Sequence, residues 1–326
     1  MKKLLLTLPL LIGASGCIGT LDSAALVKDL RILGIQLDPP EILAPDCSAL
    51  SDPRQFSSLT PLIEQPVVFK ALIADPKNPG RVLTYGLSAC ATTSDNLCSS
   101  TPAPLVINGA FQPTATAPDL SFSIHPGMAP DPNSTPPLIL FDVLSADPNR
   151  GLGGVLEPLV FHLVGGPEEI YAQKRMVYDC DHFAGTADSM KPNQLPVLEG
   201  LTLNGNPWSD VVLLTGFQSY TLEPVDFSSR QEDYVVPGFQ VQGSRVILPA
   251  VHLKESWLLS WQSDSGSISP GPTGGTSAFS GVSGPHQVKW TPDSGAPEQD
   301  VTFWVVARDG RGGESWITRK AHYKPQ

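Results

Sequence analysis

Short runs of alternating apolar and polar residues recur along the chain and predict β-strands. In the run 65–76, Val67, Phe69, Ala71 and Ile73 occupy every second position and would share one face of a strand. Runs of the same kind, separated by Pro, Gly, Asn and Asp, predict further strands at residues 30–37, 81–90, 120–125, 137–145, 157–166, 196–205, 244–253, 256–266 and 286–292. The pattern is typical of an all-β protein built from sandwiches.

The strongest local signal is a hairpin over residues 301–324. Val301, Phe303 and Val305 alternate with Trp304 on the opposite face, and the sequence Asp-Gly-Arg-Gly-Gly follows at 309–313. Glycine adopts the positive φ angles that tight connections require, so this segment predicts a turn back into a second strand.

One segment, residues 167–179, predicts a helix. Pro167 suits a first helical turn, Glu168 and Glu169 suit its positive end, and Lys174 and Arg175 suit its negative end. A strand leading into the next domain is the alternative for this segment.

The distribution of cysteine and tryptophan predicts two domains. Every cysteine lies at or before position 180 and every tryptophan at or after position 208, with a polar Pro-containing linker at 190–196. We therefore expect two Ig-like or fibronectin-like β-sandwiches in tandem: residues 28–190, with disulfides and long loops, and residues 191–326, rich in tryptophan. The second domain lacks the Cys…Trp…Cys pattern of antibody domains.

The N-terminus has the pattern of an export signal. Lys2 and Lys3 precede the uncharged run 4–12, which is too short to span a bilayer. The sequence Ala-Ser-Gly-Cys ending at Cys17 resembles the bacterial lipobox, in which the cysteine is lipidated and becomes the mature N-terminus. This resemblance implies a signal peptide at 1–16 and a lipid-anchored tether at 17–27. Ile18, by resemblance to enteric sorting rules, favours the outer membrane.

The remaining cysteines form an even set, Cys47, Cys90, Cys98 and Cys180, which predicts two disulfides in an oxidising compartment. The short polar loop between Cys90 and Cys98 favours their pairing and leaves Cys47 to pair with Cys180. Zinc binding is the rival hypothesis, with residues 178–183 as its best candidate. Neighbouring residues on a strand point to opposite faces, however, and converge poorly on one ion.

Charge excludes one class of partner. Without residues 1–16 the chain has 19 Lys and Arg against 32 Asp and Glu, a net charge of −13. Such a chain is unsuited to nucleic acid, and its charge also argues against polybasic contact with anionic lipid. Pro and Gly are frequent, with 33 and 29 residues, and they lie between apolar runs, as expected for turns.

Motifs for catalysis are absent from the sequence. It contains no GxSxG, no HExxH and no phosphate-binding glycine loop. Asp309 and Glu314 flank the predicted turn and could bind calcium, although stabilisation of the turn by Asp309 is the simpler interpretation. Trp257, Trp304 and Trp316 are candidate contacts for a glycan or protein partner, although core packing of at least three of the six tryptophans is favoured. No cofactor or metal is expected.

Two stretches carry a family resemblance: residues 30–42, LRILGIQLDPPEI, and the Trp-rich runs LSW, VKWTPD and VTFWVVARDGRGGESW near the C-terminus. They resemble uncharacterised lipoproteins of myxobacteria and related deltaproteobacteria, which place Ig-like sandwiches after a lipobox. The resemblance implies a cell-envelope location and supplies no activity. The leading hypothesis is thus an envelope-anchored lipoprotein that acts as a non-enzymatic binding or structural module for an envelope protein or glycan. The alternative is a carbohydrate-active hydrolase with a loop-cleft site in the first domain.

Overall fold

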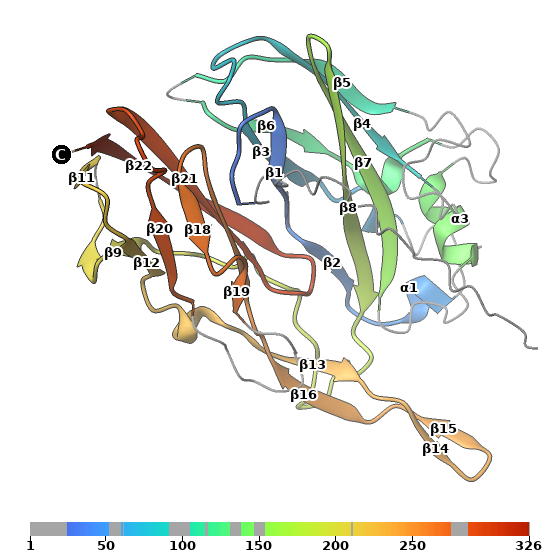
Figure 1. Ribbon diagram of the computed structural model, residues 1–326. Coiled ribbons are helices and arrows are strands. Elements are labelled where there is room, and N and C mark those ends of the chain that lie inside the picture. The colour runs from blue at the N-terminus through green and yellow to red at the C-terminus, as the bar shows by residue number, and fades with distance from the viewer. Residues whose placement is uncertain are drawn as a thin grey trace, which may run out of the picture.

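The computed structural model describes residues 25–51, 60, 62–90, 105–114, 117–130, 138–146, 154–209, 211–274 and 286–325. Over these residues the chain forms two β-sandwiches, and a narrow two-stranded ribbon projects away from both of them (Figure 1). The expected all-β sandwich class is confirmed. Among the described residues, no helix has the length and apolar character needed to cross a membrane.

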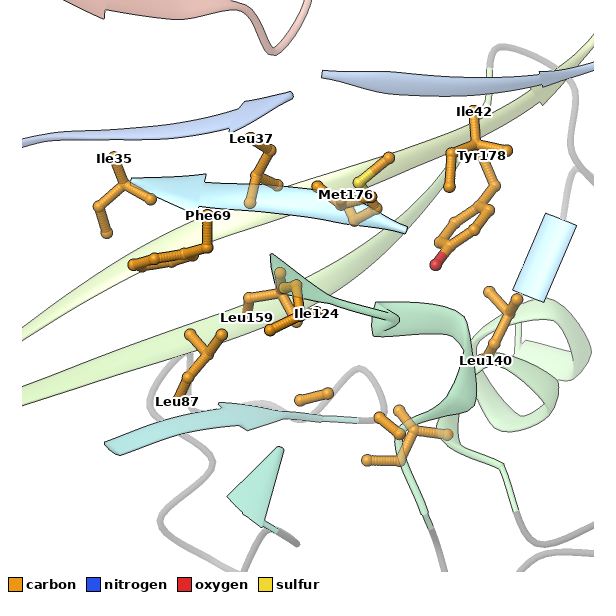
Figure 2. Packing of buried hydrophobic residues seen from close by; sticks show 14 of the residues in the cluster. Ile35, Leu37, Ile42, Phe69, Leu87, Ile124, Leu140, Leu159, Met176 and Tyr178 are labelled. Carbon is orange, nitrogen blue, oxygen red and sulfur yellow. The ribbon is translucent and has the colours of Figure 1, made fainter. Parts of the chain in front are cut away.

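Two sheets face each other in the first sandwich. The smaller sheet has the order β1 (Arg31–Asp38), β3 (Val67–Ala74), β6 (Leu120–Ile124). The larger sheet has the order β2 (Glu41–Ala44), β8 (Glu168–Cys180), β7 (Val155–Gly165), β4 (Leu83–Ala89), β5 (Leu105–Phe111). Neighbouring strands run antiparallel except β2 and β8, which are parallel. Figure 2 shows Leu37 and Phe69 of the smaller sheet pointing toward Leu87 and Leu159 of the larger one, where all four are fully buried.

Short helices close one end of this core: α1 (Ser48–Ser51), η1 (Pro126–Met128) and α3 (Ile139–Ala146). The strand predicted at residues 137–145 is therefore wrong. Ile139, Leu140, Val143 and Leu144 are the buried side chains of α3, and their spacing matches one face of a helix. Leu140 and Tyr178 belong to the same buried core (Figure 2).

The helix predicted at residues 167–179 is also wrong, because this segment is the long strand β8. It pairs with β7 from Val155↔Tyr178 to Gly165↔Glu168 without a break. Gly166 has a φ of 59°, which allows the tight turn between the two strands. Hydrogen bonds along this hairpin outweigh the weak helical preference of the charged residues.

Aromatic side chains fill the second sandwich. One sheet has the order β10 (Asn206–Pro207), β9 (Leu201–Leu203), β12 (Tyr220–Pro224), β20 (Val288–Thr291), β18 (Ser267–Ser269). The other has the order β11 (Val212–Thr215), β22 (Glu314–Lys324), β21 (Gln299–Arg308), β17 (Leu258–Ser263), β19 (Thr273–Gly274). Between them, the rings of Trp208 and Trp290 meet Phe303 edge-on at 5.2 and 5.5 Å between centroids.

The segment between the two sandwiches runs from the end of β8 at Cys180 to the start of β9 at Leu201. The N-terminal end of the described chain belongs to the second sandwich as well as the first. Ala25 is part of the second core, and the amide of Val27 donates to the carbonyl of Ser263 at 2.8 Å. Ala25 and Val27, which fall within the segment 17–27 expected as a tether, are thus hydrogen-bonded to Ser263 of β17.

We call residues 233–254 the arm. At its base, β13 (Asp233–Pro237) pairs with β16 (Ala250–Lys254), and at its tip β14 (Gln240–Gln242) pairs with β15 (Arg245–Ile247). The amide of Gly238 donates to the carbonyl of Pro249 at 2.7 Å, so both ladders keep one register. Gly243, with a φ of 65°, opens the two-residue turn at the tip, which Figure 1 shows far from either sandwich. The short 3-10 helix η2 (Ser228–Arg230) precedes the arm.

Candidate functional site

The two sandwiches meet along a seam with an apolar centre. Leu33 of β1 and Leu72 of β3 pack against Trp304 and Val306 of β21, while Trp316 of β22 packs at the side. The indole of Trp316 also donates to Asp119 at 2.9 Å, across the same boundary. The outer face of the β21–β22 hairpin is thus covered by the first sandwich.

Glu314, at the start of β22, contacts the first sandwich through both of its carboxylate oxygens. Its Oε2 atom accepts a hydrogen bond from Lys174 of β8 at 3.0 Å, and its Oε1 atom accepts one from Arg308 at 2.8 Å. The backbone amide of Ile35 also points at Oε1, 3.3 Å away. Gly34 makes this approach possible, because a Cβ atom there would lie 2.8 Å from the same oxygen.

Arg311, at the turn between β21 and β22, holds three parts of the molecule together. Its guanidinium lies 3.1 Å from Glu232 and 3.3 Å from Glu255 at the base of the arm, and 3.7 Å from Glu41 of the first sandwich. It also stacks over the ring of Tyr234 in β13, 4.2 Å from the ring centroid. One cation therefore offsets carboxylates from both sandwiches.

Asp309 shapes the turn that carries Arg311. Its Oδ1 atom accepts hydrogen bonds from the amides of Arg311 and Gly313 at 2.7 and 3.0 Å, and its Oδ2 atom accepts one from Asn193 at 2.8 Å. The prediction that Asp309 stabilises the turn is confirmed. Its oxygens are occupied by these donors, and Glu314 turns to Lys174 and Arg308, so the pair does not form the calcium site considered from the sequence.

An interdomain cleft of about 640 Å³ opens beside this network. Its lining includes Glu41, Lys174, Asp179, Arg311 and Glu314. Burial raises the pKa of Asp179 to about 7, with the nearby Glu41 carboxylate adding to the rise and the Cys180 amide and Arg311 opposing it. Burial likewise raises the pKa of Glu41, against the hydrogen bond from the Asn193 amide and the charge of Arg311.

The first sandwich has a smaller cleft of its own, about 290 Å³, lined by residues such as Ile107, His125 and Met128. No carboxylate is among its described lining residues. The alternative hypothesis placed a hydrolase site in a loop cleft of the first domain. Among the described residues, a cleft with several carboxylates in its lining lies instead between the domains.

The tryptophans proposed as partner contacts are built into the molecule. Trp257 is 1% exposed, stacks on Phe227 and donates to Glu255 at 2.9 Å. Trp304 is 8% exposed, and Trp316 is half-buried in the seam. The alternation correctly places Trp304 opposite Val301 and Phe303, but the first sandwich covers that face and leaves it unavailable to a glycan. The favoured interpretation, core packing of at least three tryptophans, is confirmed.

The predicted Cys47–Cys180 disulfide is confirmed. Cys90 is disulfide-bonded as well, and its expected partner Cys98 lies outside the described residues, as does Cys17. Cys47, Cys180 and His182 lie close enough to hold a metal ion. Two of these sulfurs are bonded to each other, however, and a disulfide lacks the thiolates that zinc requires.

Comparison with known proteins gives no family. No protein-family model and no curated protein matches the chain. Among solved structures, a chimeric titin Z1Z2 is 10% identical over 81% of this chain and 90% of its own, with a TM-score of 0.16. A marsupial T cell receptor is 9% identical over 80% of this chain and 70% of its own, with a TM-score of 0.17.

A nucleoside hydrolase-related protein of Saccharophagus degradans, associated with carbohydrate metabolism, is 16% identical over 42% of this chain, with a TM-score of 0.22. This chain spans 28% of that protein's length. Likenesses this weak carry no argument about function.

The arm is the feature that the sequence interpretation missed. Residues 244–253 were expected as one strand of the second sandwich, whereas they form one side of a projecting ribbon. A signal was present: Gly243 and Ser244 stand between two runs of alternating apolar residues, which is typical of a two-residue hairpin turn.

Proposed function

We propose that this chain is a lipid-anchored lipoprotein of the bacterial cell envelope, attached through Cys17, that acts as a non-enzymatic binding or structural module. The observation that carries the proposal is the pairing of the seam charges with one another. Glu314 pairs with Lys174 of the first sandwich, and Arg311 lies between Glu41 of the first sandwich and the pair Glu232 and Glu255 at the base of the arm. Charges arranged in this way hold two sandwiches as one body that presents its outer surfaces to a partner.

The proposed anchor would keep the second sandwich close to the membrane. Residues 25–27 already pair with β17, which leaves seven residues, or eight Cα-to-Cα steps, between Cys17 and Ala25. A chain of that length reaches at most about 28 Å when fully extended. A lipoprotein carries at least two acyl chains, which is sufficient for stable anchoring.

Metabolic labelling with palmitate tests the anchor. The wild-type chain, expressed in a bacterial host that processes lipoproteins, should incorporate label, and Cys17→Ala should not. Ser15→Ala is the matched control, because it keeps a small residue before the cysteine and should be labelled normally. Labelling of Cys17→Ala, or a wild-type chain that stays unlabelled, would contradict lipidation.

Crosslinking in native membranes tests the module. A defined envelope protein or glycan, recovered by the wild-type chain and competed by excess unlabelled chain, is the expected result. Purified protein that hydrolyses envelope glycans would instead favour an enzyme.

One observation favours that second candidate, a carbohydrate-active hydrolase. Asp179, with its pKa of about 7, lies beside Glu41 in the interdomain cleft. A carboxyl group that is half protonated near neutral pH is suited to act as a general acid. If the cleft is catalytic, Asp179→Asn should abolish glycan hydrolysis, whereas Asp188→Asn, which changes an exposed carboxylate outside the cleft, should leave it unchanged.

A further inference from the structure

The tip of the arm presents apolar side chains on one face. Val241 and Val246 are direct cross-strand neighbours, and the shared register places Phe239 and Leu248 next to them on the same face. Phe239 is 67% exposed, Val241 61% and Val246 52%. Side chains of this kind are normally buried, and a two-stranded ribbon has no second layer of its own to cover them.

The charge of the arm is opposite to that of the rest of the chain. The arm contains one acidic residue, Asp233, in a protein with 32 Asp and Glu. It contains two exposed cations, Arg245 beside the turn and Lys254 at the base, where Asp233 is the cross-strand neighbour of Lys254. The arm is therefore suited to approach an anionic surface that would repel the two sandwiches.

The size of the apolar face argues for a membrane as its occupant. The face consists of only four side chains, and one of them, Leu248, is just 37% exposed, so its area is no larger than the largest apolar patch on an ordinary monomer. Two such faces would bury less than the roughly 1,200 Å² that a stable protein–protein interface needs. The face is therefore too small to hold a second copy of the chain. A bilayer interface, in contrast, accepts a small apolar face flanked by cations.

We propose that the arm inserts the face formed by Phe239, Val241, Val246 and Leu248 into the interfacial layer of a bilayer with anionic headgroups. The opposite face, formed by Gln240, Gln242, Arg245 and the half-buried Ile247, then remains among the headgroups. This inference rests on the proposed envelope location, which places a membrane within reach, but it requires no lipid on Cys17. Together, the anchor and the arm would determine the orientation of the two sandwiches relative to the membrane.

Vesicle co-sedimentation of the unlipidated mature chain, carrying Cys17→Ala, tests the inference. This protein should sediment with vesicles that contain phosphatidylglycerol and much less with vesicles of phosphatidylcholine alone. The double substitution Phe239→Ser/Val241→Ser should reduce the bound fraction at least about tenfold, because two apolar side chains no longer leave water. Arg245→Gln/Lys254→Gln should remove the preference for phosphatidylglycerol.

Leu213→Ser is the matched control. Leu213 is 61% exposed, as Val241 is, but it lies on β11 of the second sandwich and should leave vesicle binding unchanged. Unchanged thermal melting of each variant would show that folding is intact. Vesicle binding that is absent, or that survives the arm substitutions, would overturn the inference.

The two proposals fail separately. If palmitate labels the wild-type chain and the Cys17→Ala chain does not bind vesicles, the proposed anchor is supported and the inference about the arm is overturned. A photocrosslinker at Gln242 that traps an envelope protein, with no vesicle binding, would likewise overturn the inference and assign the arm to a protein surface.

Discussion

Glu157 carries its carboxyl group into the core of the first sandwich, where the Tyr178 hydroxyl donates to it at 3.0 Å. The residue is fully buried, and burial raises its pKa to about 8 against the opposing effect of the tyrosine. The folded protein therefore holds a proton at neutral pH that the unfolded chain releases.

This proton makes stability depend on pH. The Glu157 pKa rises from 4.5 in the unfolded chain to about 8 on folding, so the folded state binds more protons across that range. The contribution of Glu157 is fully present below pH 4.5 and is lost as pH rises toward 8. The loss is on the order of 5 kcal/mol in the free energy of unfolding.

Glu157→Gln should remove that dependence, because the amide keeps an acceptor for Tyr178 and cannot ionise. Urea unfolding at a series of pH values should show that the free energy of unfolding of the variant increases relative to that of the wild type as pH rises. Glu64→Gln, which changes an exposed carboxyl, should follow the wild-type curve. Parallel curves for Glu157→Gln and the wild type would mean that Glu157 does not carry the proton.

At the scale of elements, the sequence predicted strands correctly where the alternation of apolar and polar residues coincided with a turn signal. The hairpin of β21 and β22 combined strict alternation with a glycine turn, and it forms as expected. Prediction failed where the local signal was weak. The apolar run that becomes α3 fits a buried strand or a buried helix equally well. The charges of residues 168–175 suited a helix, but pairing with β7 decided their structure.

The turn between β21 and β22 tolerates no side chain at Gly313. A Cβ atom there would lie 2.0 Å from Asp309 Oδ2 and 2.9 Å from the Pro196 ring. Gly313→Ala should therefore displace the Asp309 carboxylate from its hydrogen bonds and lower the free energy of unfolding by about 2–4 kcal/mol.

Chemical denaturation measures the effect. Gly271→Ala is the control, because nothing lies within 4 Å of the Cβ position at that glycine. It should change the free energy of unfolding by less than about 0.5 kcal/mol. Equal effects of the two substitutions would show that the Asp309 contacts do not stabilise the turn.

At the scale of the molecule, the sequence predicted two domains but not how they meet. Alternation placed Trp304 on the second face of its strand, and nothing local determined what covers that face. The answer depends on Leu33 and Leu72, more than 200 positions away in the chain. The pairing of the seam charges could not be predicted for the same reason, since Lys174 and Glu314 are 140 positions apart.

The pair Lys174–Glu314 measures how strongly the two sandwiches are coupled. Both side chains are nearly buried, at 12% and 6% exposed, so removing one leaves the other charge with little solvent to compensate it. Glu314→Gln should lower the free energy of unfolding by about 2–4 kcal/mol. In a double-mutant cycle with Lys174→Met, the coupling energy should exceed about 1 kcal/mol.

The exposed pair Arg230–Glu199, which joins η2 to the segment just before β9, serves as the control cycle. Because water screens both of its charges, its coupling energy should stay below about 1 kcal/mol. Since Lys174 belongs to one sandwich and Glu314 to the other, their coupling is free energy shared across the seam. The wild-type chain should accordingly unfold in one transition by fluorescence and circular dichroism. Two separate transitions, together with a coupling no larger than that of the control pair, would mean that the sandwiches fold independently.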